Sequence, residues 1–203
     1  EYFSDEGNDV MLMMDSLTRV AMAQREIGLA IGEPPTTKGY TPSVFALLPR
    51  LLERAGPSQG RYITGIYTVL VESDDLNDPI ADAARSLLDG HVVLSRALAN
   101  RGQFPAVDPL QSVSRLRRDI TPPEQIEDVQ RIIELMSVYN ESEDLINIGA
   151  YSAGSNTRID EAIANIDSIN DYLKQGGDVP SDYANAREML RDLCQKLVVS
   201  DGD

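Results

Sequence analysis

The sequence predicts an α/β layer fold over residues 1–121, followed by an all-helical domain over residues 122–203. In the first part, segments rich in apolar and β-branched residues alternate with segments of helical spacing, a rhythm typical of layered α/β folds. After Pro122 and Pro123 three helical stretches follow, and no strand pattern separates them. This change of pattern predicts the domain boundary at the proline pair.

The first predicted strand is the unbroken apolar run Val10–Met14, which ends at Asp15. Five apolar residues without alternation favour a strand buried on both faces, as in a parallel sheet covered by helices. From residue 16 to residue 30 the apolar spacing becomes helical, and Gly32 followed by two prolines ends this predicted helix.

A second helical stretch covers residues 43–54, and a second strand is predicted over residues 62–71, which are rich in Ile, Tyr, Thr and Val. Asp78 followed by Pro79 marks the next helix start, because Asp is a good N-cap and Pro suits the first helical position. That helix is predicted to end at Gly90.

Residues 91–94 predict a short third strand. In the helical domain, apolar residues recur at three- and four-residue intervals, so each stretch has one face for a core. These residues are Ile126, Val129, Ile132, Ile133 and Met136, then Ile159, Ala162, Ile163, Ile166, Ile169 and Leu173, then Tyr183, Ala186, Leu190, Leu193 and Leu197.

The charge balance argues against two classes of partner. The chain carries 33 acidic and 18 basic residues, a formal net charge of −15. Such a surface repels nucleic acid and anionic membranes. No apolar run approaches the roughly 20 residues that span a bilayer, and no basic-then-apolar leader is present. The opening residues Glu1, Tyr2 and Phe3 resemble the end of a helix, so we expect a piece of a longer protein.

The single cysteine and the single histidine favour structural roles. Cys194 excludes a disulfide within the chain and indicates a reducing, cytoplasmic setting. Its spacing from Leu190 and Leu197 predicts a packing residue of a helix and not a nucleophile. His91 precedes an apolar run, which predicts a structural place at the edge of a strand.

Asp15 is the first candidate for chemistry. An acidic residue at the end of a buried strand is what a nucleotide hydrolase uses to hold Mg²⁺ through its water shell. Many strands end in Asp at a turn, so the position alone favours a turn residue.

A series of motifs gives Asp15 a context. In unbroken order the chain carries DSLTR at 15–19, QRE at 24–26, GEPP at 32–35, GYTPSVF at 39–45, LPRLLERAG at 48–56 and DDLNDPIAD at 74–82. Further motifs lie at 88–91, 93–96, 105–108 and 112–115. This series resembles the hexameric export ATPases of flagella and type III secretion systems, relatives of the catalytic subunits of rotary ATP synthases. The resemblance implies part of a RecA-like P-loop NTPase core, with a parallel sheet and flanking helices, followed by an all-α C-terminal domain.

The resemblance assigns three catalytic roles. Asp15 matches the Walker B aspartate, which organises Mg²⁺ and the attacking water. Arg19 matches an arginine close to the γ-phosphate, and Arg115 matches the arginine finger offered to the nucleotide of a neighbouring subunit. A guanidinium can bind two phosphoryl oxygens at once, and such fingers are worth about 10³–10⁵ in rate. From the residues alone, a surface ion pair beside Arg117 and Arg118 is the favoured interpretation of Arg115.

Two aromatic residues match the ATP-binding pocket. Phe104 matches a position that stacks on the adenine ring, and Tyr151 lies near a second adenine-pocket position; either aromatic could instead be a core residue. Asp74 and Asp75 match an acidic pair near the active site, although a turn-capping role fits them as well.

One feature of the family is absent from the sequence. No Gly-x-x-x-x-Gly-Lys-Ser/Thr loop occurs in these 203 residues. The resemblance also places the catalytic glutamate upstream of residue 1. Because the β- and γ-phosphates then lack their cradle, we expect no ATP hydrolysis by the 203-residue chain alone, and we expect apolar sheet edges to be exposed.

The resemblance implies an ATP-hydrolysing subunit of a protein export apparatus. It would form a homohexamer with interfacial ATP sites, stay in the cytoplasm and lie peripheral to the inner membrane. Implied partners are a central stalk protein, a peripheral regulator and export chaperone–substrate complexes, the last on the helical domain. Residues 145–154 match export ATPases better than ATP synthase subunits, and flagellar export is favoured over a virulence system.

Two alternatives remain at this point. The chain could be a non-catalytic interaction module that keeps the fold without the chemistry. It could also be a true ATP synthase subunit, which the motifs at 24–26 and 32–35 disfavour.

Overall fold

The computed structural model describes residues 1–58, 61–72, 75 and 77–198. The chain forms two compact units, residues 1–89 and residues 90–203. Each unit has a hydrophobic core of its own.

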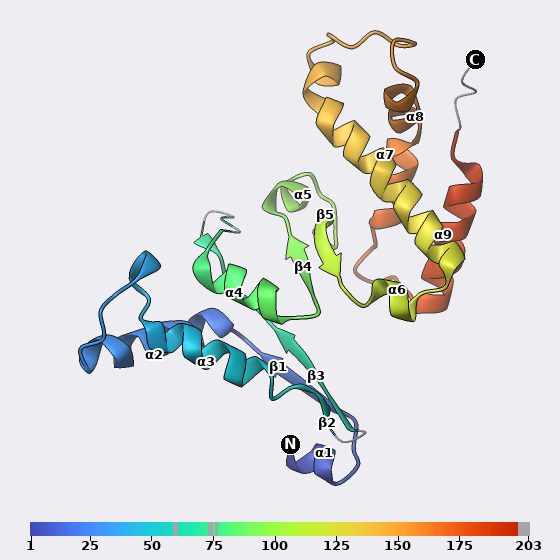
Figure 1. Ribbon diagram of the computed structural model, residues 1–203. Helices are drawn as coiled ribbons and strands as arrows, with labels where there is room; N and C mark the ends of the chain where they lie inside the picture. Colours follow the sequence, from blue (N-terminus) through green and yellow to red (C-terminus); the bar gives the residue numbers. More distant parts are fainter. Residues whose placement is uncertain (59–60, 73–74, 76, 199–203) are drawn as a thin grey trace. The chain divides into compact units, whose positions relative to one another are not determined.

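The first unit is built on a three-stranded sheet with the order β1-β3-β2 (Figure 1). β1 pairs in parallel with β3, from Val10 opposite Ile63 to Met14 opposite Tyr67, and β2 pairs antiparallel with β3. The bounds are β1 Val10–Met14, β2 Gly56–Ser58 and β3 Arg61–Tyr67. The strands predicted at residues 10–14 and 62–71 appear as β1 and β3, and their parallel pairing agrees with the predicted parallel sheet, whereas β2 was not predicted.

Helices cover one side of this sheet. The bounds are α1 Tyr2–Asp5, α2 Leu17–Ala30, the 3₁₀ turn η1 Thr37–Gly39, α3 Pro42–Leu52 and α4 Pro79–Leu87. Asp78 caps α4, because its carboxylate accepts hydrogen bonds from the backbone of Ile80 and Ala81. The sequence prediction of this helix start is confirmed. The core consists of Leu17, Ala21, Tyr40, Val44, Leu48, Leu52, Ile80 and Ala84.

Gly28 lets α2 and α3 approach closely, and Figure 1 shows these two helices side by side. A Cβ added at Gly28 would lie 2.4 Å from the Thr41 hydroxyl oxygen, far inside van der Waals contact. Thr41 itself is fully buried directly before α3. The position therefore requires a residue without a side chain.

The prediction that Val10–Met14 is buried on both faces is wrong for this structure. Met11 is 63 % exposed and Met13 72 % exposed. Within the described residues β1 is an edge strand, and no helix covers the face that these methionines share with Tyr62 and Ile66 of β3, both also exposed. The apolar run therefore forms part of an exposed apolar sheet surface at an edge strand. This agrees with the expectation that apolar sheet edges are exposed in this chain.

The second unit begins with an antiparallel pair, β4 and β5. The bounds are β4 Gly90–Leu94, α5 Arg96–Asn100, β5 Val107–Ser114 and α6 Arg117–Ile120. The third strand was predicted, but it belongs to this separate sheet. His91 lies in β4, and its imidazole Nε2 is 3.0 Å from the Gln111 carbonyl oxygen. β5 was not predicted, because Pro109 and several polar residues interrupt its apolar pattern.

Three helices complete the second unit: α7 Pro123–Asn147, α8 Thr157–Leu173 and α9 Tyr183–Lys196. All three predicted helical stretches are confirmed, and α7 continues well beyond the residues that predicted it. Their core consists of Ile132, Leu135, Ala162, Ile169 and Leu190. Cys194 packs against this core as predicted, and its thiol lies 3.6 Å from the Asp128 carbonyl oxygen.

Polar contacts join the same helices. The Arg131 guanidinium pairs with the nearly buried Glu161 at 2.8 Å, which connects α7 to α8. The buried Asn165 side chain forms two hydrogen bonds with the backbone of Val198, one to its carbonyl oxygen at 2.9 Å and one from its N–H at 2.8 Å. Among the described residues, no helix is long and apolar enough to cross a bilayer.

Candidate nucleotide-binding site

The connection from β1 to α2 places the principal candidate residue. Asp15 is exposed at the carboxyl end of β1, and Ser16 directly after it is buried. The Ser16 hydroxyl accepts a hydrogen bond from the Arg19 backbone N–H at 3.3 Å, which makes Ser16 the N-cap of α2. Leu17 is fully buried in the core of the first unit and anchors the connection there, whereas Asp15 is exposed to solvent.

The residues after β3 hold this connection from the side. The Thr68 hydroxyl donates to Asp15 Oδ1 at 2.7 Å. The Thr68 backbone accepts from Leu17 N–H at 2.9 Å and donates to the Met14 carbonyl at 3.0 Å. The nearly buried Thr18 hydroxyl lies 2.9 Å from the Leu70 nitrogen and 3.3 Å from the Leu70 oxygen. Asp15 therefore stands on a closely hydrogen-bonded junction of two parallel strands.

Arg19 lies in the first turn of α2, close to Asp15 along the chain. A positive charge at a helix N-terminus is unfavourable, because the helix dipole is positive at that end. Among the described residues the exposed Arg19 side chain has no ion-pair partner that would compensate. Helix stability thus gives no reason for an arginine here, whereas an anion bound beside the helix start would.

The acidic segment before α4 is occupied by structural contacts. Lys38 pairs with Asp75 at 2.8 Å and with Asp78 at 3.5 Å. The hydrogen bond from Lys38, with a second from the Asn77 backbone, lowers the pKa of Asp75, and the Asp75 carboxylate raises the pKa of Lys38. The turn-capping alternative is confirmed for Asp75. Its role near an active site stays a prediction, and Asp74 lies outside the described residues.

The motif at 32–35 also has a structural explanation. The Glu33 carboxylate accepts a hydrogen bond from the Ser43 backbone N–H at 3.0 Å, in the first turn of α3. This bond lowers the pKa of Glu33. Glu33 therefore satisfies one of the backbone donors that a helix start leaves open.

The other predicted site residues belong to the second unit and come from three separate segments. Phe104 lies between α5 and β5; its ring is 56 % exposed and its carbonyl oxygen accepts from the Gln175 N–H at 2.7 Å. Arg115 is exposed directly after β5. Within the described residues no ring contact joins Phe104 to Tyr151. The exposed Phe104 ring excludes the alternative of a core residue.

Tyr151 lies in the connection between α7 and α8. Its hydroxyl is 2.9 Å from both the Asn156 carbonyl oxygen and Asp160 Oδ1. The other oxygen of Asp160 accepts from the Gly154 N–H at 2.9 Å. These bonds fix the conformation of the connection and hold the half-buried ring in one position.

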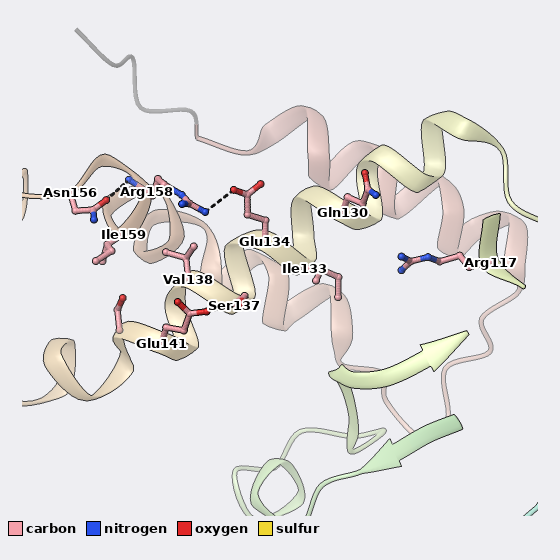
Figure 2. A pocket seen from close by; sticks show the side chains of 11 residues that line it. Arg117, Gln130, Ile133, Glu134, Ser137, Val138, Glu141, Asn156, Arg158 and Ile159 are labelled. Carbon is pink, nitrogen blue, oxygen red and sulfur yellow. Dashed lines mark hydrogen bonds and ion pairs between the residues drawn. The ribbon is translucent and has the colours of Figure 1, made fainter. Parts of the chain in front are cut away.

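A cavity of about 490 Å³ lies elsewhere, between α7 and the start of α8 (Figure 2). None of the predicted site residues lines it. Arg158 and Glu134 pair with each other in this cavity at 3.0 Å, and the Ser137 hydroxyl donates to Glu141 at 3.1 Å. Glu134, Glu141 and Arg158 thus have partners within the cavity, whereas no ion pair is described for Arg117, the fourth charged side chain that lines it.

Asp15 fits a magnesium site of the kind that nucleotide hydrolases use. Within the described part of the chain, no three His, Cys, Asp or Glu side chains gather into a metal-binding cluster. Mg²⁺ seldom has such an all-protein cage, since it keeps several waters and is held by one or two carboxylates plus substrate phosphates. A single exposed carboxylate at a strand end, with Arg19 nearby to meet a phosphate, suits that arrangement.

Comparison with known proteins identifies the family. The family described as "ATP synthase alpha/beta family, nucleotide-binding domain" matches residues 1–114, more than half of the chain. The chain belongs to this family. A second description, "T3SS EscN ATPase C-terminal domain", matches residues 121–192. Within the family, these two matches confirm the predicted resemblance to export ATPases and the predicted fold class.

The relatives include flagellum-specific ATP synthases and type III secretion system ATPases. A flagellum-specific ATP synthase of Bacillus subtilis is 61 % identical over 181 residues, covering 89 % of this chain and 41 % of that protein. The assembled ATPase EscN of the enteropathogenic E. coli type III secretion system has 45 % identity and a TM-score of 0.89, covering 95 % of this chain and 47 % of that one. EscN in complex with its central stalk EscO matches with 43 % identity and a TM-score of 0.82, covering 95 % and 46 %. The chain thus spans less than half the length of each of these relatives.

Sequence reasoning missed Thr68 and Thr18. The signal that could have indicated them is the parallel pairing of residues 10–14 with residues 62–71, which brings both carboxyl ends to one edge. The sequence pattern does not determine the register of that pairing, so it could not predict which residue lies beside Asp15.

Proposed function

We propose that the complete protein is an ATP-hydrolysing subunit of a flagellar or type III protein export apparatus. The observation that carries this proposal is the hydrogen-bonded β1–α2 connection, which presents Asp15 and Arg19 in a segment that matches a nucleotide-binding domain. The match of residues 121–192 to an export-ATPase C-terminal domain supports export over ATP synthesis. The 61 % identity to a flagellum-specific relative favours the flagellar system.

In this proposal Asp15 holds water molecules of the magnesium shell and orients the attacking water. Mg²⁺, when bound with ATP, neutralises charge that develops on the phosphate oxygens. Arg19, in the first turn of α2, meets the γ-phosphate region. Phe104 stacks on adenine through its exposed ring, and Tyr151 forms a second wall of the adenine pocket.

Arg115 acts across a subunit boundary in this proposal. As an exposed arginine at the end of β5, it is offered to ATP bound by the neighbouring copy in a homohexamer. The solved relative EscN is described as an assembled ATPase and as a complex with its central stalk EscO. By analogy we assign this protein a homohexameric ring, a central stalk partner, a peripheral regulator and export chaperone–substrate complexes, at the cytoplasmic side of the inner membrane.

We assign residues 1–121 to the nucleotide-binding domain and residues 122–203 to a helical domain that receives the chaperones. The family matches to residues 1–114 and 121–192 support this division. The two compact units instead divide the chain between residues 89 and 90, so that the β4–β5 pair belongs to the same unit as the C-terminal helices.

The test is the ATPase activity of the complete protein against its concentration. Specific activity should rise as rings assemble, because each site needs the Arg115 of a neighbour. Arg115→Ala should lower kcat by about 10³ or more while ATP binding persists. Arg118→Ala, an exposed arginine in the same segment, is the matched control and should keep its activity. Specific activity that stays constant at all concentrations would exclude the shared site.

The 203-residue chain alone should not hydrolyse ATP, because it contains no phosphate-binding loop to hold the β- and γ-phosphates. An assay of phosphate release from ATP by the purified 203-residue chain tests this prediction. Turnover that Asp15→Ala abolishes would contradict the prediction, whereas turnover that persists in Asp15→Ala would come from a contaminating enzyme.

A further inference from the structure

Thr68, the first residue after β3, contacts the β1–α2 connection at three points. Its backbone N–H donates to Met14 and its carbonyl accepts from Leu17, at 3.0 and 2.9 Å. These two bonds flank Asp15 on both sides along the chain. The backbone of Thr68 is therefore fixed beside Asp15 without any contribution from its side chain.

The hydroxyl of Thr68 forms the third contact, and it serves Asp15 alone. It donates to Asp15 Oδ1 at 2.7 Å, and the structure gives it no other partner within the described residues. The chain after Thr68 is held separately, since the Thr18 hydroxyl binds both backbone groups of Leu70. Removing the Thr68 hydroxyl would thus leave the junction of the strands intact.

This single bond determines how the Asp15 carboxylate is presented. An exposed aspartate side chain can otherwise rotate among staggered conformations. A hydroxyl that donates to an ionised carboxylate forms a short bond that is about twice as strong as a neutral one. The bond engages Oδ1, and no hydrogen bond within the described residues engages Oδ2. One oxygen is held by the protein and the other stays available.

We propose that Thr68 is a positioning residue whose hydroxyl holds Asp15 Oδ1 and so directs Oδ2 toward the magnesium-bound waters of the ATP site. The proposal rests on the proposed function, because it needs Asp15 to act at a nucleotide. Thr68 itself touches neither metal nor phosphate in this assignment.

Three variants of the complete protein test the catalytic consequence. Thr68→Val keeps the shape and loses the donor, and Thr68→Ser keeps the donor. Thr64→Val is the matched control, since Thr64 is an exposed threonine of β3, four residues before Thr68, and the structure gives it no hydrogen bond to Asp15. Side chains that orient a metal-binding carboxylate typically contribute about 10–100-fold.

Thr68→Val should therefore lower kcat at least about tenfold and raise the Mg²⁺ concentration needed for half-maximal activity, with KM for ATP little changed. Thr68→Ser and Thr64→Val should stay close to the unmodified protein. Equal losses in Thr68→Val and Thr64→Val, or an unchanged Mg²⁺ requirement in Thr68→Val, would overturn the proposal.

A second measurement needs no ATPase activity. In the 203-residue chain, the Hα–Hβ couplings of Asp15, measured by NMR, report its χ1 conformations. One conformation should dominate in the unmodified chain and in Thr68→Ser, and Thr68→Val should show averaging. Averaging already in the unmodified chain would refute the positioning role even if the complete protein is an ATPase. One dominant conformation with an inactive complete protein would instead refute the proposed function alone.

Discussion

Cys194 of α9 shows how packing changes the chemistry of one side chain. Burial is the largest cause of its altered acidity and raises the pKa of the thiol from 9.0 to about 11; the Asp128 carboxylate acts in the same direction, and the charge of Arg131 opposes it. The neutral thiol is therefore the form that the folded helical unit favours. At neutral pH this cysteine is a packing residue, as its spacing in the sequence predicted.

The stability of the helical unit should fall as the pH rises from about 9 to about 11. In this range the unfolded chain loses the thiol proton while the folded chain keeps it, so the unfolded state binds fewer protons and gains stability. The effect should be on the order of 1 kcal/mol, because the side chain is only partly buried and solvent screens it.

Guanidinium chloride unfolding at pH 8 and pH 11, followed by helical circular dichroism, measures this dependence. Burial also raises the pKa of Tyr172, which adds a pH dependence of its own, so the comparison must be made with Cys194→Ala. Between pH 8 and pH 11, the free energy of unfolding of Cys194→Ala should change less than that of the unmodified chain, by the amount predicted for the thiol. Identical pH dependence in both proteins would contradict the assignment to Cys194.

Sequence predicted the catalytic candidates through motifs and could not predict their neighbours. Asp15 was found because it ends an apolar run within a known motif series. Thr68 was missed, since its position beside Asp15 follows from the strand register and from no pattern around residue 68. Site residues in the second unit were likewise assigned by resemblance and not by spacing.

At the scale of elements, the contact of α2 with α3 depends on the absence of one side chain. Glycine in a helix costs about 1 kcal/mol relative to alanine, so Gly→Ala in a helix normally stabilises a protein. At Gly28 the added Cβ would meet the Thr41 hydroxyl at 2.4 Å and its Cβ at 2.9 Å. Steric overlap should outweigh the gain in helix propensity here.

Gly28→Ala should therefore destabilise the first unit by about 1–3 kcal/mol, the usual cost of overpacking. Chemical denaturation measures the change. Gly177→Ala is the matched control, because nothing lies within 4 Å of the Cβ it would add, and it should change stability by less than about 0.5 kcal/mol. A stabilised Gly28→Ala variant would show that the two helices can separate at no cost.

Helices were easier to predict than strands in this chain. Asp78 and Pro79 gave the start of α4 from local chemistry, and the three C-terminal helices followed from apolar spacing alone. Strands depend on partners that are distant in sequence. β5 has no clear pattern and was missed, and β1 has the pattern of a covered strand although Met11 and Met13 are exposed here.

The whole molecule has two cores that share no residue. The core of the first unit lies between Leu17 and Ala84, and the core of the second unit begins at Ile132. Residues 90–121 contribute no buried apolar side chain to either core. Stability is therefore expected to reside in two separate parts of the chain.

Leu48→Ala and Ile169→Ala should each act within one unit. Both side chains are fully buried, so each truncation should cost about 2–5 kcal/mol. Amide hydrogen exchange should show lost protection within residues 1–89 for Leu48→Ala, and within the helices of residues 90–203 for Ile169→Ala. Ile27→Ala, at a 55 % exposed position of α2, is the control and should leave both units protected.

Loss of protection throughout the chain in either core variant would show that the two cores unfold as one cooperative body. Such a result would also remove the basis for treating stability effects in the two units as additive.

The Asn165 side chain forms its hydrogen bonds with the main-chain N–H and carbonyl of Val198, and these bonds do not involve the Val198 isopropyl group. A carboxamide that pairs with a peptide unit in this way accepts any amino acid with a backbone N–H at position 198. Any residue except proline can therefore occupy position 198, whereas a deletion that removes the peptide unit leaves the Asn165 amide oxygen without this donor and its amide nitrogen with the Glu161 carbonyl as its remaining described partner. The fold therefore requires that a peptide unit be present at position 198, whereas the kind of side chain there matters little.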